Sequence, residues 1–183
     1  MEEKPKKFDE SRLVVLYDEQ TIKERVKAVA EDIMRDYRDD EPVLCVCVLK
    51  GAVMFFADLM KELGGRDVFY DFITLASYGN STTTGGTVKL VNNLREPVEG
   101  RHVLIVEDIV DSGYTLEFLN KFFAEKNALD VKTACLLDKP LGRKVDIKPD
   151  YVAFTLDRAP FIVGYGLDYA QYYRNLRHIY EIK

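Results

Sequence analysis

Three acidic side chains lie in one short stretch of the sequence together with hydroxyl groups and a glycine. The acids are Glu107, Asp108 and Asp111, and the residues that follow them are Ser112, Gly113, Tyr114 and Thr115. Carboxylates accept hydrogen bonds from sugar hydroxyls, hold Mg²⁺ or exchange a proton, and backbone amides at the start of a helix bind phosphate. Acids beside a phosphate would repel it unless they bind the sugar hydroxyls, hold Mg²⁺ or exchange a proton. The combination therefore predicts a site for a phosphorylated ribose.

Apolar residues on either side of this stretch predict the elements that position it. Val103 to Val106 form an unbroken apolar run, which predicts a strand buried on both faces that ends before Glu107. After the stretch, apolar residues recur with helical spacing at Leu116, Leu119, Phe122 and Phe123. A loop between a parallel strand and a helix lies at the carboxyl edge of the sheet, where open α/β sheets bind ligands. We therefore expect the acids and hydroxyls in a binding loop at that edge.

The order of strand, charged loop and helix recurs along the chain. Further strands are predicted at 13–17, 43–49, 67–77, 87–91, 131–137, 151–156 and 161–163, the last being the final strand, and helices at 22–37, capped by Asp18, and 52–63. Tyr169 to Leu176 is predicted to be a short helix or a turn. This repetition predicts an α/β fold with a doubly wound, mainly parallel sheet flanked by helices. No linker or internal repeat divides the chain, so we expect a single domain over residues 1–183.

Composition argues against several classes of protein. A formal net charge of −5 and a pI near 5.2 disfavour binding to nucleic acid through a broad basic surface. No apolar run approaches the roughly 18 residues that a membrane helix needs, so we expect no membrane partner and a cytoplasmic location. Cys45 and Cys47 would lie on one face of a buried strand, where reduced thiols are expected.

Four common motifs are absent from the sequence. They are G-x-x-x-x-G-K-[ST], G-x-G-x-x-G, H-E-x-x-H and G-x-S-x-G. P-loop hydrolysis, dinucleotide binding, zinc proteolysis and serine hydrolysis therefore lack their usual residues. The acidic phosphate loop remains the main chemical feature.

This loop, from Val103 to Thr115, closely resembles the phosphoribosyl pyrophosphate loop of the type I phosphoribosyltransferases. Other matching segments are Leu49-Lys50-Gly51, Ser77-Tyr78, Leu137-Asp138-Lys139-Pro140, Phe161 to Tyr169 and Tyr173-Arg174-Asn175-Leu176. In this order, over roughly residues 13 to 182, they resemble the bacterial hypoxanthine (hypoxanthine-guanine) phosphoribosyltransferases. Tyr114 departs from the family pattern, because that position often carries Leu or Lys in the family. Its backbone amide can still bind the phosphate.

The resemblance implies a reaction and an assembly. The enzyme would transfer ribose 5-phosphate from phosphoribosyl pyrophosphate to a 6-oxopurine, hypoxanthine or guanine, with Mg²⁺ as cofactor and small molecules as its substrates. Adenine would be a poor substrate, because Lys139 offers only hydrogen-bond donors to the 6-position. The family also implies a small hood built from the terminal segments and a homodimer or homotetramer.

Each matching residue takes a role by this resemblance. The ribose 5-phosphate would be bound by Glu107, Asp108, Asp111, Ser112, Gly113, Tyr114 and Thr115. Pyrophosphate would be bound by Lys50, Gly51, Arg174, Ser77 and Tyr78, the last two opening a lid that runs to Gly86. The purine would be bound by Lys139, Phe161, Ile162, Leu167 and Asp168. The catalytic residues would be Asp111, as general acid and base, and Lys139. The metal ligands would be Glu107, Asp108 and Asp168.

Simpler structural roles remain open for several of these residues. Asp111 would also suit the N-cap of the following helix, and Lys139 would suit a solvated loop. Phe161 and Ile162 would suit the core of the domain. Arg174 would suit a surface salt bridge, and the small polar stretch from residue 78 to 86 would suit a plain hairpin loop.

Two other functions fit part of the pattern. The phosphoribosyl fold also serves transcriptional regulators, which would need an added nucleic-acid-binding segment or a basic face. A magnesium-dependent receiver or phosphatase would use an aspartyl nucleophile at a strand end, and Asp108 occupies such a place. That third hypothesis leaves Ser112, Gly113 and the distal motifs without a role.

Overall fold

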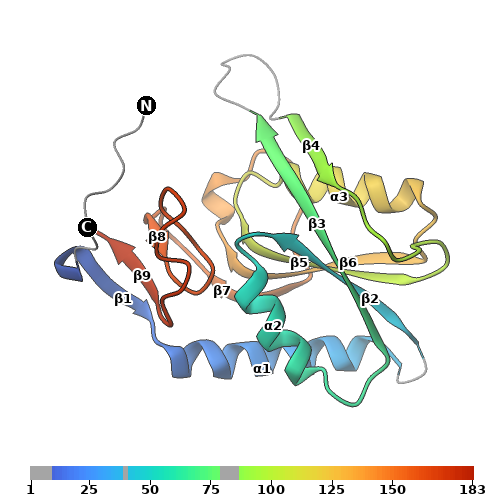
Figure 1. Cartoon of the computed structure of the whole chain (residues 1–183), viewed down its shortest axis with the longest axis horizontal. Coiled ribbons are helices and arrows are strands. Elements are labelled where there is room, and N and C mark those ends of the chain that lie inside the picture. The colour runs from blue at the N-terminus through green and yellow to red at the C-terminus, as the bar shows by residue number, and fades with distance from the viewer. Residues whose placement is uncertain (1–9, 39–40, 79–86) are drawn as a thin grey trace.

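The computed structural model describes residues 10–38, 41–78 and 87–183, which form two sheets (Figure 1). The larger sheet has the order β4-β3-β2-β5-β6-β7. Its strands are β2 (Val43–Leu49), β3 (Val68–Tyr78), β4 (Thr87–Asn92), β5 (His102–Val110), β6 (Asp130–Asp138) and β7 (Tyr151–Thr155). Every neighbouring pair is parallel except β3 and β4, which are antiparallel. The predicted doubly wound, mainly parallel sheet is confirmed.

The smaller sheet joins the two ends of the chain. It contains β1 (Leu13–Tyr17), β8 (Ile162–Val163) and β9 (Ile179–Ile182) in the antiparallel order β1-β9-β8. Figure 1 shows these three strands together beside the larger sheet. They form the small hood of terminal segments that the family resemblance implies.

Helices cover both faces of the larger sheet. They are α1 (Glu19–Asp36), α2 (Val53–Glu62) and α3 (Tyr114–Glu125), with 3-10 turns at Glu10–Arg12 and Pro140–Gly142. Helices α1 and α2 share a core cluster with Cys45 and Cys47 of β2, whereas Leu119 and Phe123 of α3 pack against Val46 on the opposite face (Figure 1). No helix in the described ranges combines the length and apolar character needed to cross a bilayer.

Local sequence explains how α1 begins and packs. Asp18 is its N-cap, and its carboxylate accepts a hydrogen bond of 2.8 Å from the amide of Thr21, as predicted. That bond lowers the pKa of Asp18 below its ordinary value. The buried residues of the helix recur at helical spacing on one face, namely Ile22, Val26, Val29, Ala30 and Ile33.

Cys45 and Cys47 are free and buried, in agreement with the sequence-based prediction, and Cys135 is free and buried as well. Burial raises the pKa of both Cys45 and Cys47 to about 12, because an ionised thiolate would be poorly solvated there. These thiols therefore remain protonated at neutral pH.

Two local predictions were wrong, and each error has a long-range cause. Strand β5 continues past Val106 to Val110, because its ladder with β6 extends from Glu107 paired with Cys135 to Val110 paired with Asp138. Glu107 and Asp108 therefore lie in the strand and not in the loop. The strand after Val163 was not predicted at all, since β9 is formed by pairing with β1 at the other end of the chain.

The segment from Tyr169 to Leu176 contains no helix. Ala170, Gln171 and Tyr173 have positive φ angles of 49°, 73° and 74°, which a right-handed helix excludes. The turn alternative of the prediction is therefore the right one.

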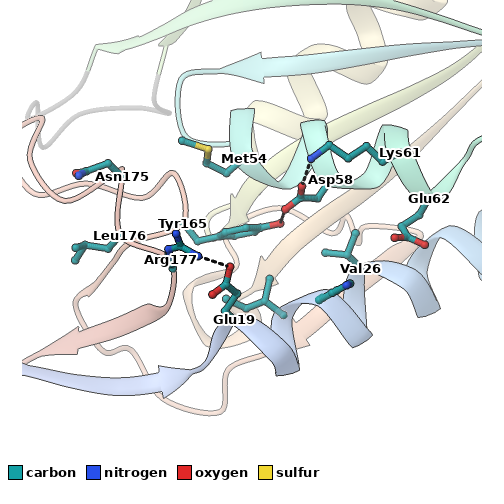
Figure 2. A pocket seen from close by; sticks show the side chains of 12 residues that line it. Glu19, Val26, Met54, Asp58, Lys61, Glu62, Tyr165, Asn175, Leu176 and Arg177 are labelled. Carbon is teal, nitrogen blue, oxygen red and sulfur yellow. Dashed lines mark hydrogen bonds and ion pairs between the residues drawn. The ribbon is translucent and has the colours of Figure 1, made fainter.

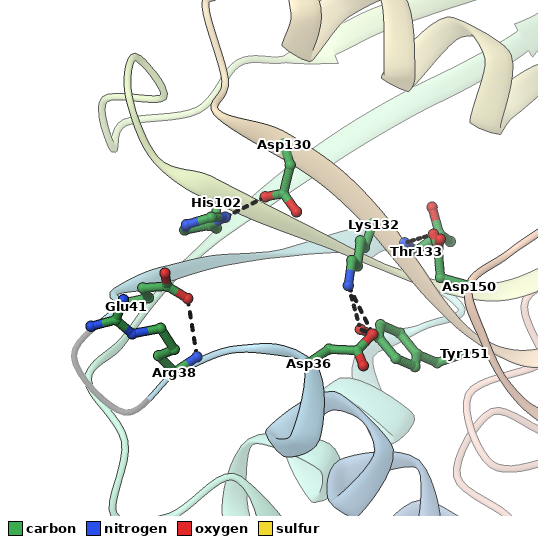
Figure 3. Close-up of polar contacts among 9 residues, drawn as sticks. All are labelled: Asp36, Arg38, Glu41, His102, Asp130, Lys132, Thr133, Asp150 and Tyr151. Carbon is green, nitrogen blue, oxygen red and sulfur yellow. Dashed lines mark hydrogen bonds and ion pairs between the residues drawn. The ribbon is translucent and has the colours of Figure 1, made fainter.

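A polar network ties the end of α1 to the start of β6 and β7 (Figure 3). The carboxylate of Asp36 accepts hydrogen bonds from Nζ of Lys132 at 2.8 Å and from the hydroxyl of Tyr151 at 2.6 Å. Nearby, Nδ1 of His102 lies 2.6 Å from Oδ1 of Asp130. These contacts lie at the amino ends of the strands, so they fix the strands at the edge opposite the predicted binding loop.

Candidate active site

The predicted site residues converge at the carboxyl edge of the larger sheet. Because β2, β5 and β6 are parallel neighbours, the residues that follow or end them lie side by side: Lys50 after β2, Asp108 near the end of β5 and Lys139 after β6. The amide of Lys139 donates to the carbonyl of Val110 at 2.9 Å, which links the last two of these strand ends.

Two glycines allow three distant segments to touch. A Cβ atom on Gly51 would overlap Oδ2 of Asp108, and a Cβ atom on Gly166 would overlap the carbonyl oxygen of Gly51. Gly166 also has a φ of 98°, which disfavours any other residue. The loop after β2, the acidic end of β5 and the loop after β8 are thus in direct contact. The peptide bond between Leu49 and Lys50 in this loop is cis.

Glu107 and Asp108 form an acidic pair in which Glu107 is buried and Asp108 is half-buried. The side chain of Glu107 is 7% exposed, and its Oε2 has no hydrogen-bond partner within the described chain. Burial, and then the neighbouring carboxyl of Asp108, raise the pKa of Glu107 well above its ordinary value. Burial also raises the pKa of Asp108.

The loop after β5 opens helix α3 with its backbone. Gly113 is the N-cap residue, with a φ of 89°, and no side chain caps the helix. Asp111 therefore does not have the N-cap role, and its exposed side chain lies against Gly142, where a Cβ atom would overlap Oδ1. The first amides of α3 lack helical partners and point out of its N-terminus. This geometry suits a phosphate group.

Arg174 lies inside the site and not on the surface. Its Nη2 forms an ion pair of 2.6 Å with Asp168, and the two side chains are 23% and 25% exposed. Its Nη1 donates to the carbonyl of Gly166 at 2.7 Å. The positive charge of Arg174 also lowers the pKa of Asp108, against the raising effect of burial. The salt bridge that the sequence left open for Arg174 is therefore present, with Asp168 as its partner, and it is partly buried.

Gln171 was missed by the sequence analysis. Its Oε1 lies 3.5 Å from Nζ of Lys50 and 3.5 Å from Nη2 of Arg174, and its amide donates to Asp168 at 2.8 Å. The side chain therefore lies between the two cations expected to bind pyrophosphate. A lone glutamine in a tyrosine-rich turn gives no sequence signal of such a place.

The residues predicted to bind the purine also lie together. Nζ of Lys139 lies 3.4 Å from the carbonyl of Pro160, directly before Phe161. Phe161 is 52% exposed and meets Tyr169 edge to face, with ring centroids 5.3 Å apart, so it does not belong to the core. Ile162 and Leu167 are buried, which leaves only their backbones for contact with a ligand. The Leu167 carbonyl already accepts from the amide of Gly164 at 3.0 Å.

The expected lid cannot be compared with the structure. Ser77 and Tyr78 end β3 as backbone, while their side chains and residues 79–86 lie outside the described residues. The lid therefore stays a prediction.

A separate hollow lies between α1, α2 and the segment 175–177 (Figure 2). Its volume is about 510 Å³, and none of the predicted site residues lines it. Figure 2 shows Tyr165 reaching from the hood toward Asp58 of α2, and their hydrogen bond is 2.8 Å long. Three acidic and three basic side chains surround an apolar floor: Glu19, Asp58 and Glu62, with Lys23, Lys61 and Arg177.

The fold and the converging site define a phosphoribosyltransferase. Residues 15–170 match the phosphoribosyl transferase domain family, and the chain belongs to that family. The chain is 47% identical over 171 residues to the hypoxanthine-guanine phosphoribosyltransferase of Bacillus subtilis strain 168, and the match covers 92% of each chain.

Solved structures agree with this relationship. A hypoxanthine-guanine phosphoribosyltransferase from Bacillus anthracis, crystallised with HEPES in its active site, is similar with a TM-score of 0.88 and 43% identity, covering 93% of this chain and 98% of that one. The hypoxanthine phosphoribosyl transferase of Trypanosoma cruzi is similar with a TM-score of 0.89 and 38% identity, covering 98% and 95%.

Replacing Glu107 with Gln is expected to stabilise the free protein at neutral and higher pH. The pKa of Glu107 is raised in the folded state above its ordinary value of 4.5. The stability that its neutral form gives the protein is therefore fully present below pH 4.5, and it is lost as the pH rises through the folded-state pKa. Glu107→Gln has no charge to bury. Its unfolding temperature should match that of the wild type below pH 4.5 and exceed it by about 2–4 °C at pH 8, for a gain of about 1 kcal/mol.

Thermal unfolding measured by circular dichroism from pH 4 to pH 9 tests this expectation. Glu117→Gln is a matched control, because Glu117 lies on the exposed side of α3, where it pairs with Lys121. An equal difference between Glu107→Gln and wild type at every pH would show that the carboxyl is not destabilised by burial.

Proposed function

We propose that this chain is a purine salvage enzyme that transfers the 5-phosphoribosyl group from phosphoribosyl pyrophosphate to hypoxanthine, guanine or both, giving IMP or GMP and pyrophosphate. The observation that carries the proposal is the contact of Asp108, Gly51 and Gly166, which joins the three segments needed for ribose, pyrophosphate and purine. The names of the relatives support the same substrates. Relatives that are enzymes also favour catalysis over the regulator hypothesis.

The phosphoribosyl half of the substrate would lie over the N-terminus of α3. The backbone amides of Ser112 to Thr115, with the hydroxyls of Ser112 and Thr115, bind the 5-phosphate. Glu107 and Asp108 accept hydrogen bonds from the ribose hydroxyls. The buried, unpartnered Oε2 of Glu107 supports this role, because a ligand hydroxyl would supply its missing partner.

The pyrophosphate half would lie between the loop after β2 and the loop after β8. Lys50 and the amide of Gly51 face it from one side and Arg174 from the other, while Ser77 and Tyr78 close over it. Departure of pyrophosphate leaves an oxocarbenium-like centre on the ribose, so cations must neutralise the leaving group while water is kept out. Both oxygens of the Asp168 carboxylate already hold this region together, through Arg174 and the amide of Gln171.

The donor set fits Mg²⁺ only with help from the substrate. No group of three or more metal-ligating side chains occurs in the described part of the chain. Mg²⁺ binds through one or two carboxylates plus phosphate oxygens in such sites, and Glu107, Asp108 and Asp168 offer those carboxylates. The bound ion would neutralise charge on the pyrophosphate.

The purine would stack on the exposed ring of Phe161, with its 6-oxo group at Nζ of Lys139 and its edge at the backbones of Ile162 and Leu167. Asp168 lies on the pyrophosphate side of this base. Asp111 would exchange a proton with an imidazole-ring nitrogen of the purine while the other nitrogen forms the bond to ribose. Its exposed carboxyl and the absence of an N-cap role support this assignment.

Three coarser features complete the proposal. Residues 1–183 form one phosphoribosyltransferase domain. The location is cytoplasmic, which the three free, buried thiols support. The active particle is a homodimer or homotetramer, which is supported by the balanced charges around the hollow beside α1 and α2, because an isologous contact needs a self-complementary surface.

The reaction can be tested with purified protein, Mg²⁺ and phosphoribosyl pyrophosphate. Incubation with hypoxanthine, guanine, xanthine and adenine in separate reactions should give nucleotide from hypoxanthine, guanine or both. Because Lys139 can only donate to the 6-position, kcat/KM for adenine should be lower by about a hundredfold or more. Absence of nucleotide with every 6-oxopurine would refute the proposed function.

Replacing Asp111 with Asn should remove most of the turnover and leave the fold intact. The side chain keeps its size but cannot exchange a proton, so kcat should fall by about 10²-fold or more. The Kd for phosphoribosyl pyrophosphate, measured by calorimetry, should change by less than about threefold. Asp146→Asn, at an exposed position nearby, is the control and should keep its activity. A kcat equal to that of the wild type would remove Asp111 from the acid and base role.

The assembly can be measured by light scattering during size-exclusion chromatography. The expected particle has two or four times the chain mass of 21.0 kDa. A mass of one chain at micromolar concentrations that support full activity would contradict the oligomer.

A further inference from the structure

Arg143 forms the most buried ion pair among the described residues. Its Nη2 pairs with Oδ1 of Asp138, and the two side chains are only 15% and 14% exposed. The other terminal nitrogen, Nη1, is buried and has no partner within the described chain. Burying a guanidinium with a spare donor costs desolvation free energy, and apolar residues of similar size usually give equal or better stability. Stability alone therefore does not account for this arrangement.

The side chain of Arg143 lies beneath the phosphate loop. A Cβ atom on Gly113 would lie 3.1 Å from Cδ of Arg143 and 2.8 Å from methyl groups of Val145 and Ile147. The amide of Lys144 donates to the carbonyl of Ser112 at 2.9 Å. The segment 143–147 thus packs against the N-terminal turn of α3. Arg143 contacts this turn through its methylene groups, while its guanidinium pairs with Asp138.

The other end of the ion pair lies next to the purine-binding lysine. Asp138 is the last residue of β6, and Lys139 follows it directly. The short turn between them and Arg143 is held by bonds from Gly142 to the Lys139 carbonyl at 3.1 Å and from Arg143 to the Pro140 carbonyl at 3.2 Å. Gly142 in this turn also contacts the Asp111 carboxyl.

We propose that Arg143 is a positioning residue that holds the phosphate loop and Lys139 at a fixed separation through its ion pair with Asp138. It touches neither substrate. Its effect reaches the reaction through the placement of Asp111 and Lys139 relative to the 5-phosphate, where a shift of about 1 Å can cost 10²-fold in rate. This inference rests on the proposed phosphoribosyl transfer and adds a residue that no sequence motif contains.

The decisive experiment separates positioning from stability. Arg143→Met alone leaves the Asp138 charge buried and unpaired, so it is compared with the double variant Asp138→Asn with Arg143→Met, in which no unpaired charge remains. The double variant should unfold within a few degrees of the wild type, yet KM for phosphoribosyl pyrophosphate should rise by about tenfold or more and kcat should fall. Arg143→Lys keeps the charge and should show a smaller rise, of about threefold.

Arg101→Met is the matched control. Arg101 also forms a partly buried ion pair, with Glu96 at 3.1 Å, but it precedes β5 at the opposite edge of the sheet. This variant should lose stability and keep KM and kcat within about twofold of the wild type. If the double variant and Arg143→Lys both keep wild-type KM and kcat, Arg143 has only a structural role and the inference is wrong.

A second readout does not depend on turnover. Hydrogen exchange of the backbone amides from Ser112 to Thr115 in the free protein should be about tenfold faster in the double variant and unchanged in Arg101→Met. If the wild type makes no nucleotide but this exchange behaves as expected, the proposed function is wrong and the positioning role of Arg143 is supported. Unchanged exchange at these amides in the double variant would refute that positioning role, whatever the activity.

Discussion

Two adjacent carboxyl groups lie near the carboxyl end of the central strand β5, where little water reaches them, and the surrounding structure depends on that constraint. Burial raises the pKa of both Glu107 and Asp108, so the free protein contains acids that are poorly solvated and incompletely bonded. Such an arrangement opposes stability. It is suited to a polyhydroxyl ligand, because the ligand hydroxyls would donate the hydrogen bonds that the carboxyl groups lack within the protein.

The loops that bury these acids also bring the remaining groups of the site to them. Asp108 lies against Gly51, Gly51 lies against Gly166, and the Gly166 carbonyl accepts from Arg174. The first two of these contacts require a residue without a side chain at a close approach. As a result, the cation of Arg174 lies near the acids of β5 although 66 residues separate it from Asp108 in the chain. The hood strands hold this half in place by pairing β9 with β1.

Local patterns predicted most of the elements, and the errors occurred where pairing partners are far apart in sequence. An apolar run followed by two acids suggested that β5 ends at Val106, but hydrogen bonding to β6 carries the strand through Glu107 and Asp108 to Val110. Strand β9 has a weak local pattern and exists because β1 pairs with it. The polar, tyrosine-rich turn near Gln171 was ambiguous from its local pattern. In the fold it contains residues with positive φ angles, and Gln171 contacts Arg174 and Asp168.

The sequence by itself determined the alternating order of strands and helices, the cap at Asp18, the buried thiols and the set of residues predicted to bind a phosphorylated ribose. These follow from residue type, periodicity and motif, which are local properties. Only the tertiary structure decided that Gly113 and not Asp111 caps α3, that Arg174 is engaged with Asp168, and that Arg143 lies between the phosphate loop and the end of β6. Those facts depend on close approach between segments that the chain order does not specify, because packing and parallel pairing set the distances.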